Sequence, residues 1–242
     1  MSWLDVMVEE QLKNLPSDAF SDRSGGFDDI AHVIAVLEKA IERNTVDTAD
    51  AMRAAAAKAS ADPFHDLVKN PVFAPAGAKL RKAAMVFPRI LRSSLFIAIY
   101  SHLEHLLLSW CESLCEDLTL PKTFANGPRT EAYPHRYLRY IRDEAKFDIG
   151  DFDQWAEWQP VDAYRRARNC LAHNGGIVRR SEDRNRIRLL PHVQIDESCL
   201  QFGEPLVHLL PGACEAAVQA AKALIERLLG VRDRDPRTTA AP

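Results

Sequence analysis

The sequence predicts an all-α fold, a bundle of long antiparallel helices that carries one small β-hairpin. Apolar residues recur at three- and four-residue spacing over long segments, which is the period of an amphipathic helix. Of the 242 residues, 47% are hydrophobic, enough for a sizeable buried core. The period changes after residue 176, where short β-branched runs alternate with charged turns.

The N-terminal half contains three predicted helices, over residues 3–14, 27–59 and 77–117. Pro16 follows the first, and a group of prolines separates the second from the third. Within the third helix, Pro88 marks either a kink or a new helix start. The apolar stripe on this helix, expected to face either the core or a partner, consists of Leu95, Ile99, Leu103, Leu106, Trp110 and Leu114.

The C-terminal half contains three further predicted helices, over residues 134–147, 151–172 and 212–229. The runs that predict the strands of the hairpin are residues 177–178, 187–190 and 192–195. Charged turns separate these runs, which is typical of a small insertion between helices.

The chain divides into three predicted parts. Residues 1–76 form an N-terminal helical extension, residues 77–230 form the helical bundle, and residues 231–242 form a polar, disordered tail. Three roles remain open for the long helix over residues 27–59. These are to cover the functional site, to dock a regulator, or to extend a dimer interface.

Composition excludes several classes of protein. A net charge of −3 disfavours a protein that coats nucleic acid through bulk positive charge. The acidic N-terminus lacks a secretory signal, and five cysteines without a CxxC pair indicate reduced thiols, so we expect a cytoplasmic protein. The most apolar window is interrupted by His102, Glu104 and His105, which predicts no membrane span.

His102 and His105 suggest a metal site, because they lie about one helical turn apart. Their spacing is not that of the HExxH arrangement, however, and no further ligand cluster is visible. We therefore expect neither a metal nor another cofactor. Glu104 is better explained as the partner of an arginine, either Arg168 or a structural one.

The segment RRARNCLAHNGG, residues 165–176, combines an Arg-Asn pair, a histidine and an abrupt helix end. Asn169 and His173 lie one turn apart on a helix, with Arg168 at the edge of the same face, so the three side chains can point into one space. The glycine pair that follows predicts a helix stop, because glycine accepts the left-handed conformation of a C-cap. His173 then lies at an exposed helix end, where the helix dipole favours a protonated imidazole.

These residue types meet the needs of phosphodiester cleavage in RNA. The ribose 2′-hydroxyl loses a proton as it attacks, the leaving 5′-oxygen gains one, and negative charge grows on the phosphorane. His173 can move the protons, Arg168 can pair with two phosphate oxygens, and Asn169 can orient the imidazole or bind the phosphate. This chemistry requires no metal.

Arginines are concentrated around this motif. Eight lie between residues 165 and 188, where the only acidic residues are Glu182 and Asp183. The expected RNA-binding residues are Arg165, Arg166, Asn174, Arg179 and Arg180. The alternative for the arginine-rich stretch after the glycine pair is a solvated hairpin without a role in binding. Trp158 and Tyr164 either stack on a base or belong to the core, and Cys170 is expected to be packed rather than nucleophilic.

The motif resembles that of the HEPN superfamily of helical-bundle domains, R-[polar]-x-x-x-H, at Arg168, Asn169 and His173. The segment YSHLEHLLLSW, residues 100–110, resembles the earlier core helix of that family, and Glu104 matches its acidic position near the site. The resemblance covers roughly residues 88–230.

The resemblance implies a HEPN-like bundle and a metal-independent endoribonuclease, whose cleft combines two copies of the motif in a homodimer. It also implies a place in a prokaryotic toxin, abortive-infection or phage-defence system, with RNA as substrate and an antitoxin or another defence protein as partner. One alternative is a non-catalytic dimeric module for interaction or for nucleotide or RNA binding. In another alternative both residues are purely structural: Arg168 forms an ion pair with a neighbouring helix, and His173 caps the end of its own helix.

Overall fold

The structure, a computed structural model, describes residues 26–59, 78–126, 132–197 and 204–234. Its α-helices are α2 (Phe27–Ala59), α4 (Phe87–Asp117), α5 (Tyr133–Asp143), α6 (Trp158–Asn174), α7 (Ser181–Ile187) and α8 (Ala213–Arg232). The shorter elements are the helical turns η1 (Lys82–Val86), η2 (Thr123–Asn126) and η3 (Phe152–Gln154) and the strands β1 (Val193–Asp196) and β2 (Leu206–Leu209). These parts are all-α with one small antiparallel sheet, which confirms the predicted class.

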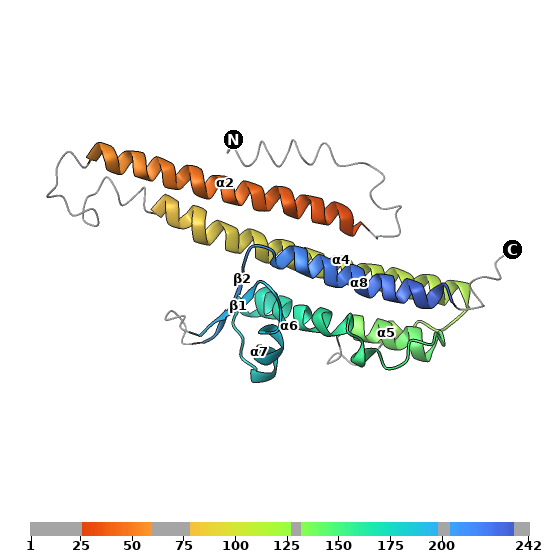
Figure 1. Ribbon diagram of the computed structural model, residues 1–242. Helices are drawn as coiled ribbons and strands as arrows, with labels where there is room; N and C mark the ends of the chain where they lie inside the picture. The colour runs from red at the N-terminus through yellow and green to blue at the C-terminus, as the bar shows by residue number, and fades with distance from the viewer. Residues whose placement is uncertain (1–25, 60–77, 127–131, 198–203, 235–242) are drawn as a thin grey trace.

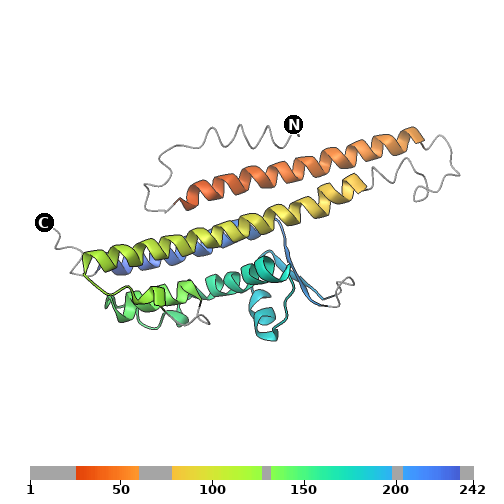
Figure 2. The same ribbon diagram turned by 180° about the vertical axis from the view of Figure 1, so that it is seen from behind.

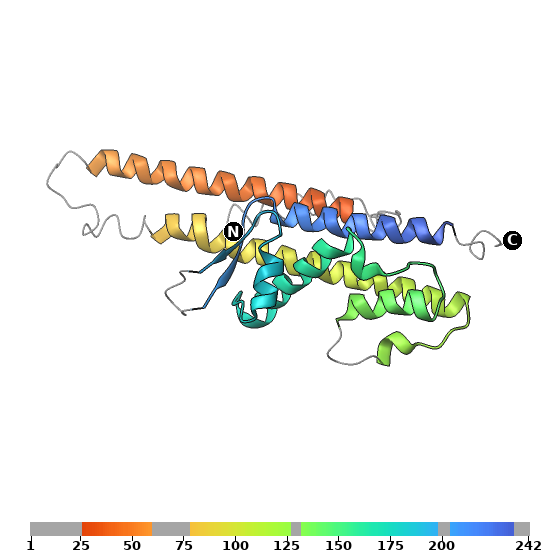
Figure 3. The ribbon, with the colours of Figure 1, turned by 60° about the horizontal axis from the view of Figure 1, so that its bottom comes forward.

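The helices form three layers, as Figures 1 and 2 show from opposite sides. The middle layer consists of α4 and α8, with α2 on one side and α5 and α6 along the other. α2 is antiparallel to α4, because Phe27 at its start contacts His102, whereas Glu38 further along it binds Arg92. Figure 3 shows α7 and the two strands beside α6, the helix that carries the motif.

A single hydrophobic core extends through the layers. Phe27 and Ile34 of α2 are fully buried and belong to the same cluster as residues of α4, α6 and α8. The first half of α2, which belongs to the predicted N-terminal extension, therefore packs directly on the bundle. The helix predicted over residues 3–14 lies outside the described residues.

The core helix α4 buries a broader face than the predicted stripe. Ile99, Leu103 and Leu114 are buried as expected, but Leu95, Leu106 and Trp110 are only partly buried. Much of the buried surface lies one position later, at Phe96, Tyr100, Leu107, Cys111 and Cys115. The reason is that α2, α5, α6 and α8 all contact α4, so it is covered from more than one direction.

The helix that contains Pro88 is continuous from Ala78 to Asp117. The turn before the proline, η1, is a π-helix, in which the amide of Phe87 donates to the carbonyl of Lys82 five residues earlier. Pro88 then occupies the first turn of α4. A wide turn and a proline in a first helical turn are both compatible with the missing proline N–H, so the helix neither ends nor begins there.

This continuous helix is the one element of the described parts that is long and apolar enough to cross a membrane. One third of its most apolar window, 33%, is buried inside the bundle. Because the core helix of a soluble protein has the same length and composition, this feature is weak evidence for a membrane span.

The hairpin differs from the prediction in three places. Residues 177–178 contribute only a single bridge, residues 187–190 form no strand, and the second strand, β2, lies outside the predicted runs. Within the run at residues 187–190, Ile187 ends the helix α7 (Ser181–Ile187), and residues 188–190 form the turn that follows it. Acidic residues in the first turn of α7 and arginines in its last turn match the helix dipole, a charge pattern that outweighs the β-branched run. β1 and β2 pair in antiparallel register, and Ile177 adds a single bridge to Leu206.

Helix boundaries also differ by several residues. α5 ends at Asp143 rather than 147, and α6 begins at Trp158, after the separate turn η3. α8 continues to Arg232, two residues into the predicted tail, while residues 235–242 lie outside the described part.

Candidate functional site

The motif helix α6 ends as its glycines predict. Gly175 adopts the left-handed conformation, with φ 61° and ψ 22°, and its amide donates to the carbonyl of Cys170. The amide of Gly176, with φ 91°, donates to the same carbonyl at 2.8 Å. The chain then turns toward β2, where the amide of Val207 donates to the carbonyl of Gly176. This stop fixes the position of the last turn of α6, which carries His173.

Arg168 lies between α6 and α4 in a polar setting. Its Nη1 donates to Oδ1 of Asn169 at 3.0 Å, and its Nη2 lies 3.7 Å from Oε2 of Glu104. The guanidinium also lies over the ring of Tyr100, 5.5 Å from its centroid. About a fifth of the side chain, 19%, remains exposed. The structure thus brings together Arg168, Asn169 and Glu104.

Burial and charge act in opposite directions on Glu104. Burial raises the pKa of this carboxyl, and the nearby Arg168 and Arg165 offset only part of that effect. Burial, reinforced by the charge of Glu104, also raises the pKa of Tyr100 well above its ordinary value. Tyr100 therefore stays a neutral phenol at physiological pH, and Arg168 is the principal cation of this group.

His173 does not join this group within one chain. On an ideal helix, residues five apart differ by about 140° in direction, whereas residues four apart differ by about 40°. Because Arg168 faces α4, His173 points elsewhere, on the side of Asn169. The imidazole is exposed and makes no hydrogen bond or ion pair with the residues that the structure describes.

The outer face of α6 borders a cavity of about 530 Å³, which we call the α6 cavity. Six of the predicted site residues line it: Arg165, Arg166, Asn169, Asn174, Arg179 and Arg180. They come from α6 and from the chain that follows its glycine stop. Arg179 and Arg180 are exposed, and Arg179 lies 3.9 Å from Glu204. The cavity therefore gathers every predicted RNA-binding residue.

Two of these arginines are already paired with carboxylates. Asp162 accepts from Arg165 at 2.7 Å and from Arg166 at 2.9 Å. Arg166 also contacts Asp183 at 2.7 Å and Glu182 at 3.0 Å. Burial tends to raise the pKa of Asp162, but the two arginines outweigh it and hold that pKa below its usual value. The main role of Arg166 is consequently structural, because its guanidinium is already bound by these carboxylates.

Arg89 lies at the end of the motif helix, although no sequence pattern predicts it there. Its Nη2 lies 3.3 Å from the carbonyl oxygen of Gly175, to which it donates. Within the described parts it has no carboxylate partner, which leaves its charge available at the end of α6. Burial and the nearby Arg89 also lower the pKa of His208, against the opposite influence of Asp196. Only the antiparallel packing of α4 on α6 brings residues 86 positions apart together.

The remaining candidates belong to the core or the surface. Trp158 and Tyr164 are almost fully buried, which favours the core alternative over base stacking. Burial raises the pKa of Cys170 to about 11, as expected for a packed thiol. The ring of His102 packs edge-on against Phe27, and His105 is exposed. Among the described residues, no group of three or more His, Cys, Asp or Glu side chains could hold a metal ion.

The arrangement offers three chemical elements. Arg168, held between Glu104 and Asn169, can stabilise an anion, and His173 can accept or donate a proton. The α6 cavity presents arginine and amide donors to a ligand beside them. Comparisons of the chain with models of protein families, with curated proteins and with solved structures find no match.

Proposed function

We propose that this protein is a metal-independent endoribonuclease of the HEPN type, active as a homodimer. The observation that carries the proposal is the α6 cavity, where Asn169 of the motif lies among the predicted RNA-binding residues. Arg168 and Glu104 lie on the α4 side of the same helix, and His173 lies exposed near the end. This placement suits a site that binds the phosphates of an RNA strand along α6 and cleaves the strand beside the last turn of that helix.

Each residue has a defined role in the proposed reaction. One His173 removes the proton of the ribose 2′-hydroxyl, whose oxygen attacks the adjacent phosphorus. A second imidazole gives a proton to the leaving 5′-oxygen, so that the products carry a 2′,3′-cyclic phosphate and a 5′-hydroxyl. Arg168 stabilises the phosphorane, and Asn169 and Glu104 position its guanidinium. The number of protons is unchanged over the step.

The need for two imidazoles supports a site made by two copies. Each chain contributes one motif histidine, which cannot be base and acid in the same step, whereas two-fold symmetry supplies a pair. Arg168 and His173 also point in different directions from one helix. We further propose a cytoplasmic role in a toxin or phage-defence system, where an antitoxin or another defence protein restrains the activity.

Cleavage in excess EDTA tests the proposal. The wild-type protein should cut total RNA in EDTA, and His173→Ala should reduce the rate by a factor of at least about 10², the usual contribution of a proton-transfer group. His105→Ala is the matched control, because His105 is an exposed histidine of α4 outside the site. Intact RNA with the wild-type protein, or equal cleavage by His173→Ala, would contradict the proposal.

One observation favours a second candidate, a non-catalytic RNA- or nucleotide-binding module. Arg168 is already engaged by Asn169 and Glu104, and Arg165 and Arg166 are engaged by Asp162. A module of this kind would bind RNA without cutting it. Intact RNA after incubation, together with an RNA affinity unaffected by His173→Ala, would identify the module.

A further inference from the structure

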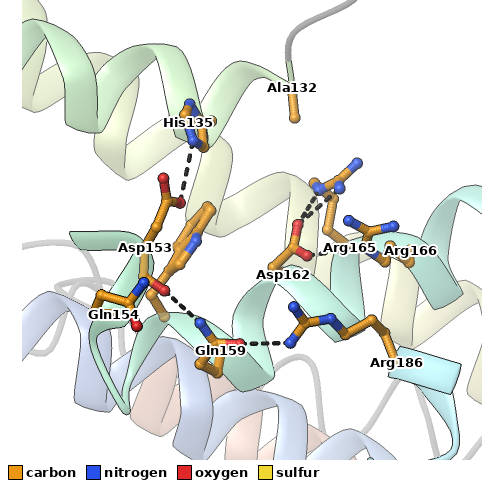
Figure 4. Close-up of a pocket in the computed structure, with 10 residues that line it drawn as sticks. Ala132, His135, Asp153, Gln154, Gln159, Asp162, Arg165, Arg166 and Arg186 are labelled. Atoms are coloured by element: carbon orange, nitrogen blue, oxygen red, sulfur yellow. Dashed lines mark hydrogen bonds and ion pairs between the residues drawn. The ribbon is translucent and has the colours of Figure 1, made fainter. Parts of the chain in front are cut away.

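A second, larger groove lies next to the α6 cavity, at the start of α6. It encloses about 700 Å³ between the beginning of α5, the turn η3, the first turns of α6 and the helix α7. Figure 4 shows His135 and Asp153 on one wall and Arg165, Arg166 and Arg186 on the other. We call it the Arg186 groove. The motif residues Arg168, Asn169 and His173 do not line it.

Arg186 carries a charge that no described carboxylate neutralises. Its Nη1 donates to the neutral amide oxygen of Gln159 at 2.7 Å, and the side chain is exposed. Gln159 is in turn fixed by a hydrogen bond from its amide nitrogen to the carbonyl of Asp153. The guanidinium is thus held at the groove while its other N–H groups remain able to bind a ligand.

Arg165 is a second available donor in this groove. Its Nε and Nη2 both contact one oxygen of Asp162, at 2.9 and 2.7 Å, which leaves Nη1 without a described acceptor. Arg166, by contrast, is surrounded by Asp162, Glu182 and Asp183. The ligand-binding capacity of the groove therefore rests on Arg165 and Arg186.

The two hollows are neighbours along α6 and share part of their lining. Arg165 and Arg166 line both the Arg186 groove and the α6 cavity, so one path follows α6 from the motif to its first turn. Five arginines and four carboxylates line this path, a net charge of +1 without His135. So small a net charge gives little non-specific attraction, and binding depends on individually placed donors.

We propose that the Arg186 groove is a distal binding site for the phosphates of single-stranded RNA, with Arg165 and Arg186 as the phosphate ligands. The proposal rests on the proposed ribonuclease function and assigns the substrate class of that site. A strand that lies in the α6 cavity continues into the Arg186 groove without leaving α6. A flexible single strand can adapt to individually placed donors along one helix, whereas a duplex presents its phosphates on a stiff, regular surface.

RNA binding by a cleavage-deficient protein tests this proposal. In the His173→Ala background, a fluorescently labelled oligouridine RNA would be titrated and its anisotropy measured at several salt concentrations. Arg186→Ala should weaken binding on the order of 10-fold, the loss of one charged hydrogen bond. The slope of log affinity against log salt should become shallower by about 0.7, the value for one phosphate contact on a single strand.

Two matched variants separate a phosphate contact from a structural effect. Arg186→Lys retains the charge and should keep the salt slope of the parent. Arg43→Ala removes an exposed arginine of α2, outside the groove, and should leave both affinity and slope unchanged. If Arg186→Ala behaves like Arg43→Ala, or if the parent binds no oligouridine, the proposal is wrong.

Competitors distinguish the sources of the phosphate. Unlabelled oligouridine should displace the labelled strand at far lower concentration than uridine monophosphate or an RNA duplex of equal length. Equal displacement by the mononucleotide would overturn the strand assignment, and equal displacement by the duplex would overturn the single-strand assignment. Because binding is measured without cleavage, an inactive site would contradict the ribonuclease proposal alone.

Discussion

At the scale of single residues, Glu104 links the protonation of the site to the stability of the protein. Burial raises its pKa in the folded chain above the value in the unfolded chain. The folded state then binds this proton more tightly, so ionisation of Glu104 reduces stability. This loss is absent below the ordinary pKa of a glutamate and is complete once the pH exceeds the raised pKa.

We therefore expect Glu104→Gln to raise the Tm at neutral pH. An amide at this position carries no charge to desolvate, and the gain should shrink as the pH falls through the range where wild-type Glu104 becomes protonated. Thermal unfolding measured by circular dichroism over a pH series would show the trend. Glu112→Gln, at an exposed position of the same helix, serves as control. A lower Tm for Glu104→Gln would mean that the ion pair with Arg168 outweighs the cost of burial.

At the scale of elements, α2 is joined to α4 by a buried ion pair in addition to apolar contacts. Arg92 and Glu38 are 10% and 16% exposed and bind in two-pronged geometry. Burial opposes the charge of Arg92, but the hydrogen bonds that it donates to Glu38 are the larger effect and raise the arginine pKa. The pair holds the first half of α2 against α4, three residues after Arg89 on α4.

Breaking this pair should be more costly than removing it. Arg92→Ala leaves Glu38 as an unpaired, largely buried charge, so we expect a loss of about 3–5 kcal/mol in the free energy of unfolding. Replacing both residues by methionine should recover most of that loss, because no charge remains to be desolvated. Urea denaturation of the single and double variants measures both effects. Arg53→Ala, which breaks an exposed pair with Asp50, should cost at most about 1 kcal/mol.

The helices and strands differ in how well sequence patterns predict them. Apolar periodicity predicted the class and α2 from its first to its last residue, and the glycine pair predicted the end of α6, because these signals are local. α7 was misread, since a β-branched residue at its end also fits a short helix with favourable end charges. The contacts of Glu104 with Arg168 and of Arg89 with Gly175 depend on the packing of α4 on α6. No local pattern specifies the alignment of two distant helices.

At the scale of the whole molecule, the site is distributed along one helix rather than enclosed in one pocket. Arg168 faces α4, Asn169 lines the α6 cavity, and His173 is exposed beyond them. The core that holds α6 in place includes residues from α2 to α8, so the whole bundle supports the site. In the proposed reaction, a second copy of the chain would supply the second imidazole.

Mixing active and inactive subunits tests this shared site. If one scissile phosphate needs His173 from both copies, a dimer of one wild-type and one His173→Ala subunit is inactive. In an equal mixture that has exchanged subunits, only about a quarter of the dimers contain two wild-type subunits. Cleavage should therefore fall to about a quarter of that of a wild-type sample with the same total protein concentration. Sites that work independently would retain about half. Mixing with His105→Ala subunits should leave cleavage unchanged, because that histidine lies outside the motif.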